Sequence, residues 1–245
     1  MVIIKPELFI LTYNRLEYLK LCLESVWNQT LKVPINIWDN GSTDGTREYL
    51  TDLYKNDKLN GGKFFDNASN VGIAEARNKG LELIKNTCII ISDDDMYYVD
   101  KNYFKHMFNC WNHLVKKHTR IAVLSNYHPF DKGKYSEKIF KEAYLFGKYE
   151  LHYITGSPPG NWMLDKEVIL SMNGFRIPNG KKMGFAAYHL NKRISNSEFP
   201  FVRIDKIDGK VYKGVEHIDT VDHPMNKRDN YKEYIEFRIR EKGKD

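Results

Sequence analysis

The stretch that decides the fold is CIIISDDDM, residues 88–96, in which an apolar run ends in three consecutive aspartates. A short apolar run without polar alternation is typical of a parallel strand that is buried on both faces. Asp93, Asp94 and Asp95 cannot stay in that core, because burying an unpaired carboxylate is costly. We therefore expect these carboxylates at the carboxyl end of a central strand, the edge where open α/β sheets bind ligands.

The three adjacent carboxylates repel one another, and a hard divalent cation with oxygen ligands would hold them together. A solvated acidic turn or a helix N-cap is equally compatible with three aspartates in a row. The triplet alone leaves both readings open.

Composition predicts a globular protein built as one large α/β domain, or as a domain with a smaller appendage: the chain has 245 residues, of which 29% are charged and 42% hydrophobic. The first residues lack the features of a signal peptide, and no apolar run approaches the roughly 20 residues of a membrane span. We expect a cytoplasmic protein with three reduced cysteines, Cys22, Cys88 and Cys110, and leave peripheral membrane contact open. The net charge of +6 favours anionic partners. The scattered Lys and Arg residues argue against nucleic acid.

Apolar segments and helical patterns alternate through about residue 125, which predicts βαβ units and a mainly parallel sheet. In the first helix, Asn14 and Glu17 resemble a capping box, and in the third, Ala76 and Gly80 predict close packing on the sheet. The expected strands are 8–11, 34–39, 63–65, 88–91 and 121–125, and the expected helices start after 15, near 48, after 72 and after 100.

The pattern changes after residue 125, where Tyr, Lys, His and Phe become frequent and an insertion over a cleft is expected. Turn signals at Gly147 and at Asp208-Gly209 predict two hairpins. Apolar character resumes at 160–164, where Asn161 and Trp162 are expected in a loop, and further expected elements are a short helix capped by Asp165, a helix at 186–194 and a charged helix at 227–240. No repeat, linker or low-complexity segment divides the chain, so residues 1–245 read as a single domain.

Four motifs in this order resemble family 2 glycosyltransferases of the GT-A fold. They are Thr12-Tyr13-Asn14-Arg15, Trp38-Asp39-Asn40-Gly41-Ser42-Thr43-Asp44-Gly45-Thr46, Asn70-Val71-Gly72 with Ala76-Arg77-Asn78-Lys79-Gly80, and Ser92-Asp93-Asp94-Asp95. The resemblance covers roughly the first hundred residues closely. It implies a Rossmann-like α/β domain with a mainly parallel central sheet flanked by helices. Residues 1–125 would bind a nucleotide sugar, and residues 126–245 would add a small antiparallel element, the acceptor side and a closing segment.

By this resemblance, the first and third motifs line the nucleotide-sugar pocket, through Thr12, Tyr13, Asn14, Arg15, Asn70 and Gly72. Asp39 would accept a hydrogen bond from the nucleobase, and Tyr13 offers a ring on which a pyrimidine can stack. Arg77 would pair with the diphosphate or the base edge. The alternatives are an Asx turn at Asp39 and a surface ion pair at Arg77.

The triplet resembles the family's D-x-D element, in which one carboxylate contacts the ribose and another holds Mn²⁺ or Mg²⁺ on the diphosphate. The register stays open, and we rank Asp95 and Asp94 above Asp93 as metal ligands. His217, in Val215-Glu216-His217-Ile218, resembles a late histidine that reaches the metal or diphosphate. His223 is a weaker candidate, and Lys227 with Arg228 would close over the phosphates.

The sequence departs from the family where the catalytic base is expected. Gly174-Phe175 is followed by Lys181-Lys182-Met183-Gly184-Phe185-Ala186-Ala187-Tyr188-His189, which has no carboxylate. A base needs a suitable pKa within hydrogen-bond reach of the acceptor hydroxyl. The candidates are His189, Asp165, Asp131 and Glu137. Inversion stays the default outcome, with retention or a binding-only protein as alternatives.

The sequence therefore predicts metal-dependent transfer of a sugar from a nucleoside diphosphate, with UDP preferred over GDP or dTDP, to a hydroxyl of a glycan or lipid-linked acceptor. Asn161 and Trp162 are the expected acceptor contacts. A sugar-phosphate nucleotidylyltransferase would need a Gly-rich loop after the first strand, where Thr12-Tyr13-Asn14-Arg15 stands instead. A non-catalytic nucleotide-sugar or glycan-binding module is the other alternative.

Overall fold

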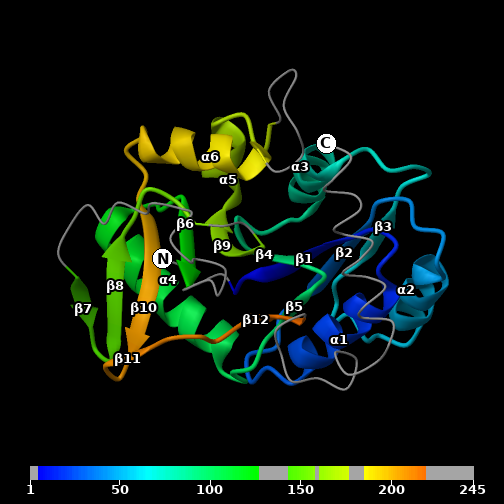
Figure 1. The fold of residues 1–245 in the computed structure, drawn as a ribbon, viewed down its shortest axis with the longest axis horizontal. Coiled ribbons are helices and arrows are strands. Elements are labelled where there is room, and N and C mark those ends of the chain that lie inside the picture. The colour runs from blue at the N-terminus through cyan, green and yellow to red at the C-terminus, as the bar shows by residue number, and fades with distance from the viewer. Residues whose placement is uncertain (1–4, 127–142, 158–159, 177–184, 219–245) are drawn as a thin grey trace, which may run out of the picture.

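The computed structural model describes residues 5–126, 143–157, 160–176 and 185–218. Within these residues, ten strands form one sheet in the order β3-β2-β1-β4-β9-β6-β10-β8-β7, with β11 paired to β10 (Figure 1). The strands are β1 (Glu7–Thr12), β2 (Ile35–Asp39), β3 (Phe64–Asp66), β4 (Cys88–Asp93), β6 (Val123–Asn126), β7 (Tyr144–Phe146), β8 (Tyr149–Tyr153), β9 (Asn161–Asp165), β10 (Phe201–Ile207) and β11 (Lys210–Val211). A separate antiparallel pair joins β5 (Met96–Tyr97) to β12 (Glu216–His217).

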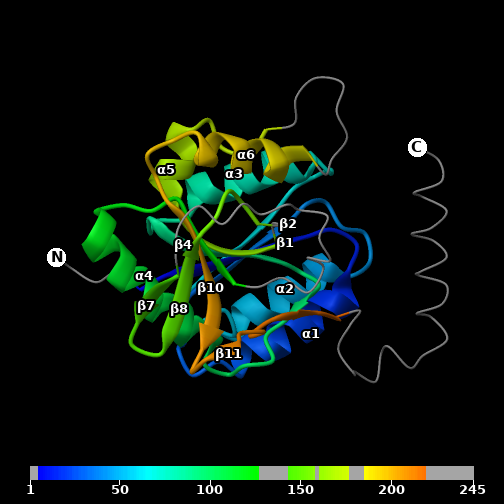
Figure 2. The same ribbon diagram turned by 60° about the vertical axis from the view of Figure 1, so that its left-hand side comes forward.

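Helices cover both faces of this sheet, so the molecule has three layers (Figures 1 and 2). One face carries α1 (Leu16–Trp27), α2 (Thr46–Lys55) and α4 (Tyr103–His118), and the other carries α3 (Ile73–Leu83), α5 (Lys166–Ser171) and α6 (Phe185–Ser195). Each face has its own hydrophobic cluster. Because β4 is central, Ile89 and Ile90 are fully buried and Ile91 is 2% exposed, as its unbroken apolar run predicts.

The parallel strands bring their polar ends to one edge of the sheet. In register, Thr12 at the end of β1 lies beside Asp39 at the end of β2, and Leu11 lies beside Asp93 at the end of β4. Asp39 in turn pairs with Asp66 at the end of β3. This edge is the one at which the sequence placed the aspartate triplet.

The second half of the chain completes the same sheet. β9 lies antiparallel between β4 and β6, β10 runs parallel to β6, and β8 runs antiparallel to β10. The two predicted hairpins are present, and the turn at Asp208 and Gly209 has φ angles of 52° and 76°, as a tight hairpin turn requires. The predicted α/β class with a mainly parallel sheet is confirmed. The antiparallel strands β7, β8 and β11 extend that sheet.

The predicted capping box of the first helix is wrong. Arg15 is the N-cap of α1 and its side chain makes no capping bond, while Asn14 has a φ of 49°, outside the helix. The backbone N–H of Leu16 is instead bonded by Asp44 Oδ2, at 2.9 Å. A loop from the second motif therefore caps the helix, which local sequence spacing cannot reveal.

Close packing of α3 on the sheet is confirmed at Gly80, where an added Cβ would overlap the ring of Phe9. The three cysteines are buried and free. Among the described residues, no helix combines the length and the apolar character that crossing a membrane requires. The predicted helix at 227–240 lies outside the described residues.

Candidate functional site

A cavity of about 550 Å³ lies where β1 and β4 end. It joins the aspartate triplet to the first and third motifs and to the late histidine. Its lining residues are Leu11, Thr12, Tyr13, Arg15, Asn40, Asn70, Ile73, Asp93, Asp94, Asp95 and His217. The other predicted donor-site residues, Asn14, Asp39, Gly72 and Arg77, are next to a lining residue in the chain or in contact with one. Residues far apart in the sequence therefore meet at one place.

Thr12 and Arg15 hold the second and third aspartates. The Thr12 hydroxyl donates to Asp94 Oδ2 at 2.8 Å. One guanidinium nitrogen of Arg15, Nη1, lies 3.0 Å from Asp94 Oδ1 and 2.7 Å from Asp95 Oδ2. Because the side chains of Asp94 and Asp95 are only 5% and 8% exposed, water screens them little, and this cation offsets much of their repulsion.

Asp94 is buried, and its negative charge is costly to sustain there. Burial raises its pKa to about 7, although the Arg15 guanidinium lowers it; the Asp95 charge adds to the rise and the Thr12 hydrogen bond counters it. Additional positive charge in the cavity would therefore stabilise the ionised form of Asp94.

Arg77 supports Asp93 from α3. Its side chain is 4% exposed, and its Nη2 lies 2.5 Å from Asp93 Oδ1. The guanidinium Cζ also lies 5.3 Å from the centre of the Phe175 ring. The sequence predicted that Arg77 pairs with the diphosphate or the base edge. In the structure its charge is directed to Asp93, which it holds at the cavity wall.

The β5–β12 pair carries His217 to the triplet. His217 lies opposite Met96 in register, and the next N–H, of Ile218, donates to the Asp95 carbonyl at 2.8 Å. His217 Nε2 lies 3.3 Å from Asp95 Oδ2. The other carboxylate oxygen, Asp95 Oδ1, is buried and has no hydrogen-bond partner within the described part of the chain. Asp95 thus faces a histidine and an arginine with one oxygen still unsatisfied.

Asp39 ends β2 in the Asx turn that the sequence left open. The N–H and hydroxyl of Ser42 both donate to Asp39 Oδ1, at 3.0 and 2.5 Å. Burial raises the pKa of Asp39, and the Ser42 hydrogen bonds counter that rise. Both bonds end on Oδ1, so Oδ2 is the oxygen left for an N–H group of a ligand.

Sequence reasoning included Asn40 and Ser42 in the second motif but gave them no role. The Ser42 hydroxyl accepts the Asn14 N–H at 2.9 Å. The Asn40 amide donates to Asn70 Oδ1 at 2.9 Å and accepts the Val71 N–H at 3.2 Å. These two residues tie the first three motifs together. Their position directly after a strand end is the signal that points to them.

A comparison with known families decides what this cavity belongs to. The model of glycosyl transferase family 2 matches residues 7–169, which is more than half of the chain. The chain belongs to glycosyl transferase family 2. The resemblance read from the four motifs is therefore confirmed, and with it the enzyme class.

Relatives of this family 2 chain include bacterial glycosyltransferases. Glycosyltransferase GlyA of Streptococcus pneumoniae is 25% identical over 154 residues, which are 58% of this chain and 21% of that protein. Glycosyltransferase GlyG of the same organism is 24% identical over 161 residues, 64% of this chain and 51% of that protein. An uncharacterized glycosyltransferase of Haemophilus influenzae is 33% identical over 112 residues, 45% of this chain and 44% of that protein. The chain thus spans about half or less of these curated relatives.

Solved structures confirm the GT-A fold. Residues 1–349 of Staphylococcus aureus TarS, in complex with UDP-GlcNAc, superpose with a TM-score of 0.61 at 15% identity, over 90% of this chain and 62% of that one. GalNAc-T7 with UDP, GalNAc and Mn²⁺ gives a TM-score of 0.65 at 14% identity, over 89% of this chain and 44% of that one.

In this family 2 chain, Asp165 lies at the wrong edge of the sheet for a base. It pairs in register with Cys88, the first residue of β4. The triplet begins at Asp93, the last residue of that strand. The oxygens of Asp165 accept both Nε and Nη2 of Arg120 at 2.8 Å and cap α5 through the N–H groups of Glu167 and Val168. The prediction that Asp165 caps a short helix is confirmed, and its proposed catalytic role is corrected.

The predicted acceptor contacts Asn161 and Trp162 are the first two residues of β9, and both side chains are buried. Trp162 is 0% exposed and lies 5.5 Å, between ring centres, from Phe201. Asn161 is 3% exposed, and its amide nitrogen donates to Tyr103 Oη and to Asn126 Oδ1. The Trp162 ring is therefore enclosed in the core, whereas Asn161 Oδ1 has no hydrogen-bond partner within the described residues.

The remaining base candidate within the described residues, His189, is half-buried on α6 and does not line the donor cavity. Asp131, Glu137, His223, Lys227 and Arg228 lie outside the described residues, as does the 177–184 part of the segment after Gly174-Phe175.

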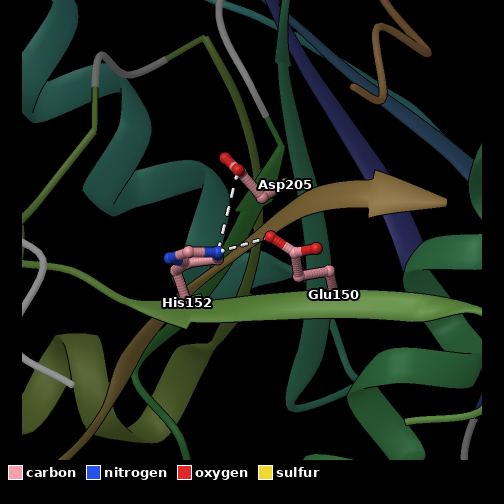
Figure 3. A group of neighbouring side chains, drawn as sticks. All are labelled: Glu150, His152 and Asp205. Carbon is pink, nitrogen blue, oxygen red and sulfur yellow. Dashed lines mark hydrogen bonds and ion pairs between the residues drawn. The ribbon is translucent and has the colours of Figure 1, made fainter. Parts of the chain in front are cut away.

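A second group of ligand-type side chains lies on β8 and β10, apart from the triplet (Figure 3). Glu150, His152 and Asp205 offer atoms within 4.8 Å of one another. Both carboxylates already have cationic partners, since Lys206 Nζ lies 2.9 Å from Glu150 Oε1 and Arg203 Nη2 lies 2.7 Å from Asp205 Oδ1. The group is thus a charge-balanced network.

Proposed function

We propose that this chain transfers a sugar from a nucleoside diphosphate, UDP in preference to GDP or dTDP, to a hydroxyl of a glycan or lipid-linked acceptor. The observation that carries the proposal is the convergence on Asp95 of Arg15 from the first motif and His217 from β12. A cluster of this kind, at the carboxyl edge of a parallel sheet, suits a diphosphate with its cation.

The donor nucleotide would lie along the cavity from Tyr13 to the triplet. Tyr13 lines the cavity and is 42% exposed, so its ring face is free for a base to stack on. Asp39 Oδ2 would accept the ring N–H of a pyrimidine. Asp93, which Arg77 holds in place, is the carboxylate we assign to the ribose. The preference for UDP rests on the TarS and GalNAc-T7 complexes, while a mannosyltransferase of the same fold binds GDP-Man.

The residues at the triplet fit Mn²⁺ or Mg²⁺. Carboxylate oxygens and a neutral imidazole are suitable ligands, and Asp95 Oδ1 has no hydrogen-bond partner within the described residues. We assign Asp95, Asp94 and His217 as the residues that would hold the ion, because Asp93 is engaged by Arg77. When bound, the ion would act as a Lewis acid on the diphosphate leaving group.

The proton acceptor we propose is His189, with inversion as the outcome. With Asp165 at the opposite edge, His189 is the candidate left within the described chain. Replacement of His189 by Ala should abolish acceptor-dependent product formation while the affinity for the donor is kept. Loss of donor affinity in that variant would instead place His189 in the nucleotide site.

The proposed function is tested by incubation of the full chain with UDP-, GDP- and dTDP-sugars, with Mn²⁺ or with a chelator, and with varied acceptors. Mn²⁺-dependent release of nucleoside diphosphate supports it. Formation of nucleoside triphosphate from pyrophosphate would indicate a nucleotidylyltransferase, and binding without turnover would indicate a non-catalytic module. Asp95→Asn should abolish the Mn²⁺-dependent release of nucleoside diphosphate. Glu82→Gln, a neutralised carboxylate on the exposed surface of α3, is the matched control and should keep it.

A further inference from the structure

The ion pair between Arg15 and the triplet differs in geometry from a fixed structural pair. Arg120 holds Asp165 through two nitrogens, Nε and Nη2, each 2.8 Å from its own carboxylate oxygen. Arg15 instead contacts two carboxylates, Asp94 and Asp95, and both contacts use Nη1. One guanidinium charge is therefore shared between two carboxylates, and a cation with two positive charges can compete for both.

Solvent can reach the Arg15 side chain. Its side chain is 24% exposed, against 4% for Arg77, the other arginine of the triplet. Its Cζ lies 5.5 Å from the centre of the Tyr18 ring, one turn along α1. This ring stays within reach of the guanidinium after its carboxylate contacts are broken.

The carboxylates that Arg15 holds are the ones assigned to the metal. Arg77 holds Asp93, whereas Asp94 and Asp95 share Arg15. A guanidinium and a divalent cation therefore compete for the same oxygens. Without any cation, two buried carboxylates in consecutive positions would repel each other.

We propose that Arg15 is a displaceable counter-cation, which holds Asp94 and Asp95 together in the nucleotide-free protein and yields their oxygens to the divalent cation. This inference rests on the proposed function, since it assumes that the triplet is the metal site. The displaced guanidinium would turn toward the diphosphate or stay over Tyr18. The protein alone then binds metal weakly, and binding of the donor favours binding of the metal through Arg15.

The test is a titration of the full chain with Mn²⁺ alone, without nucleotide, followed by electron paramagnetic resonance of the free ion. Arg15→Met keeps the length of the side chain and removes its charge. We expect it to bind Mn²⁺ about tenfold more tightly than the wild type, which corresponds to about 1.4 kcal/mol. Arg47→Met is the matched control, because Arg47 pairs with Asp66 at the same edge of the sheet. We expect this variant to bind Mn²⁺ as the wild type does.

Unchanged or weaker Mn²⁺ binding by Arg15→Met would overturn the inference. Arg15→Gln guards against a Met variant that does not fold: its amide is polar but carries no charge, so its Mn²⁺ affinity should also lie above that of the wild type. An affinity equal to or below the wild type's overturns the inference as well. Turnover of a nucleotide sugar by the wild type, measured in parallel, separates this failure from a failure of the proposed function.

Discussion

His217 Nε2 lies 3.3 Å from Asp95 Oδ2, so the two halves of the chain complete one site together. Asp95 follows the central strand β4, whereas His217 is in β12, which pairs only with the short strand β5. Within the described residues, this two-stranded ribbon brings a residue of the second half of the chain to the cavity.

Replacement of His217 by Ala should weaken Mn²⁺ binding in the presence of UDP by on the order of 10- to 100-fold, because a proposed ligand of the ion is removed. The fold should be kept, since β12 is held by backbone hydrogen bonds. Calorimetric titration with Mn²⁺ measures the effect, and circular dichroism checks the fold. An unchanged affinity would remove His217 from the metal site.

Replacement of Asp165 by Ala should lower the free energy of unfolding by about 2 kcal/mol, because the variant loses a helix cap and a forked ion pair. The folded fraction should keep its turnover, since Asp165 lies at the edge of the sheet opposite the triplet. Urea unfolding and assays at low temperature measure the two quantities. A stable variant without turnover would return Asp165 to the list of candidate bases.

Much of the donor half could be predicted from sequence, because its signals are local. An unbroken apolar run places Ile89 to Ile91 in the core, and the abrupt change to aspartate places the triplet at the strand end. The parallel register then brings Thr12, Asp39 and Asp93 to one edge. Family motifs supplied the same residues independently.

The acceptor half was predicted less well, because its residues take their roles from contacts that are distant in sequence. Asn161 and Trp162 read as a polar and aromatic loop, yet β9 lies between β4 and β6 and buries both. Asp165 forms an ion pair with Arg120, and Arg77 forms one with Asp93. A single sequence does not show that a later strand will be inserted between β4 and β6, or which charges will pair.

Replacement of Gly80 by Ala should lower the free energy of unfolding by about 1–3 kcal/mol, because the added methyl group overlaps the Phe9 ring in a packed core. Ala is the better helix former, so a gain in stability would show that α3 lies farther from β1 than the structure indicates. Urea unfolding measures the change. Gly61→Ala is no suitable control, since its φ of 79° adds backbone strain.

The free energy of unfolding of Asp94→Asn should increase, relative to that of the wild type, as the pH rises. Burial raises the pKa of Asp94 to about 7 in the folded protein, above the value of about 4 expected when unfolded. The folded wild type therefore binds this proton more tightly and loses stability between those two pH values as the proton is released. Asn resembles the protonated form and does not titrate. Urea unfolding at pH 5 and pH 8 without metal measures the difference, and an opposite trend would contradict the pKa assignment.

If Asp95 joins the nucleotide to a divalent cation, calorimetric titration of UDP will show it. We expect the wild type and Glu82→Gln to bind UDP in the presence of Mn²⁺ and to bind it far more weakly with a chelator, whereas Asp95→Asn should bind weakly under both conditions. Equal UDP affinity with Mn²⁺ and with the chelator, or full Mn²⁺-dependent binding by Asp95→Asn, would contradict it.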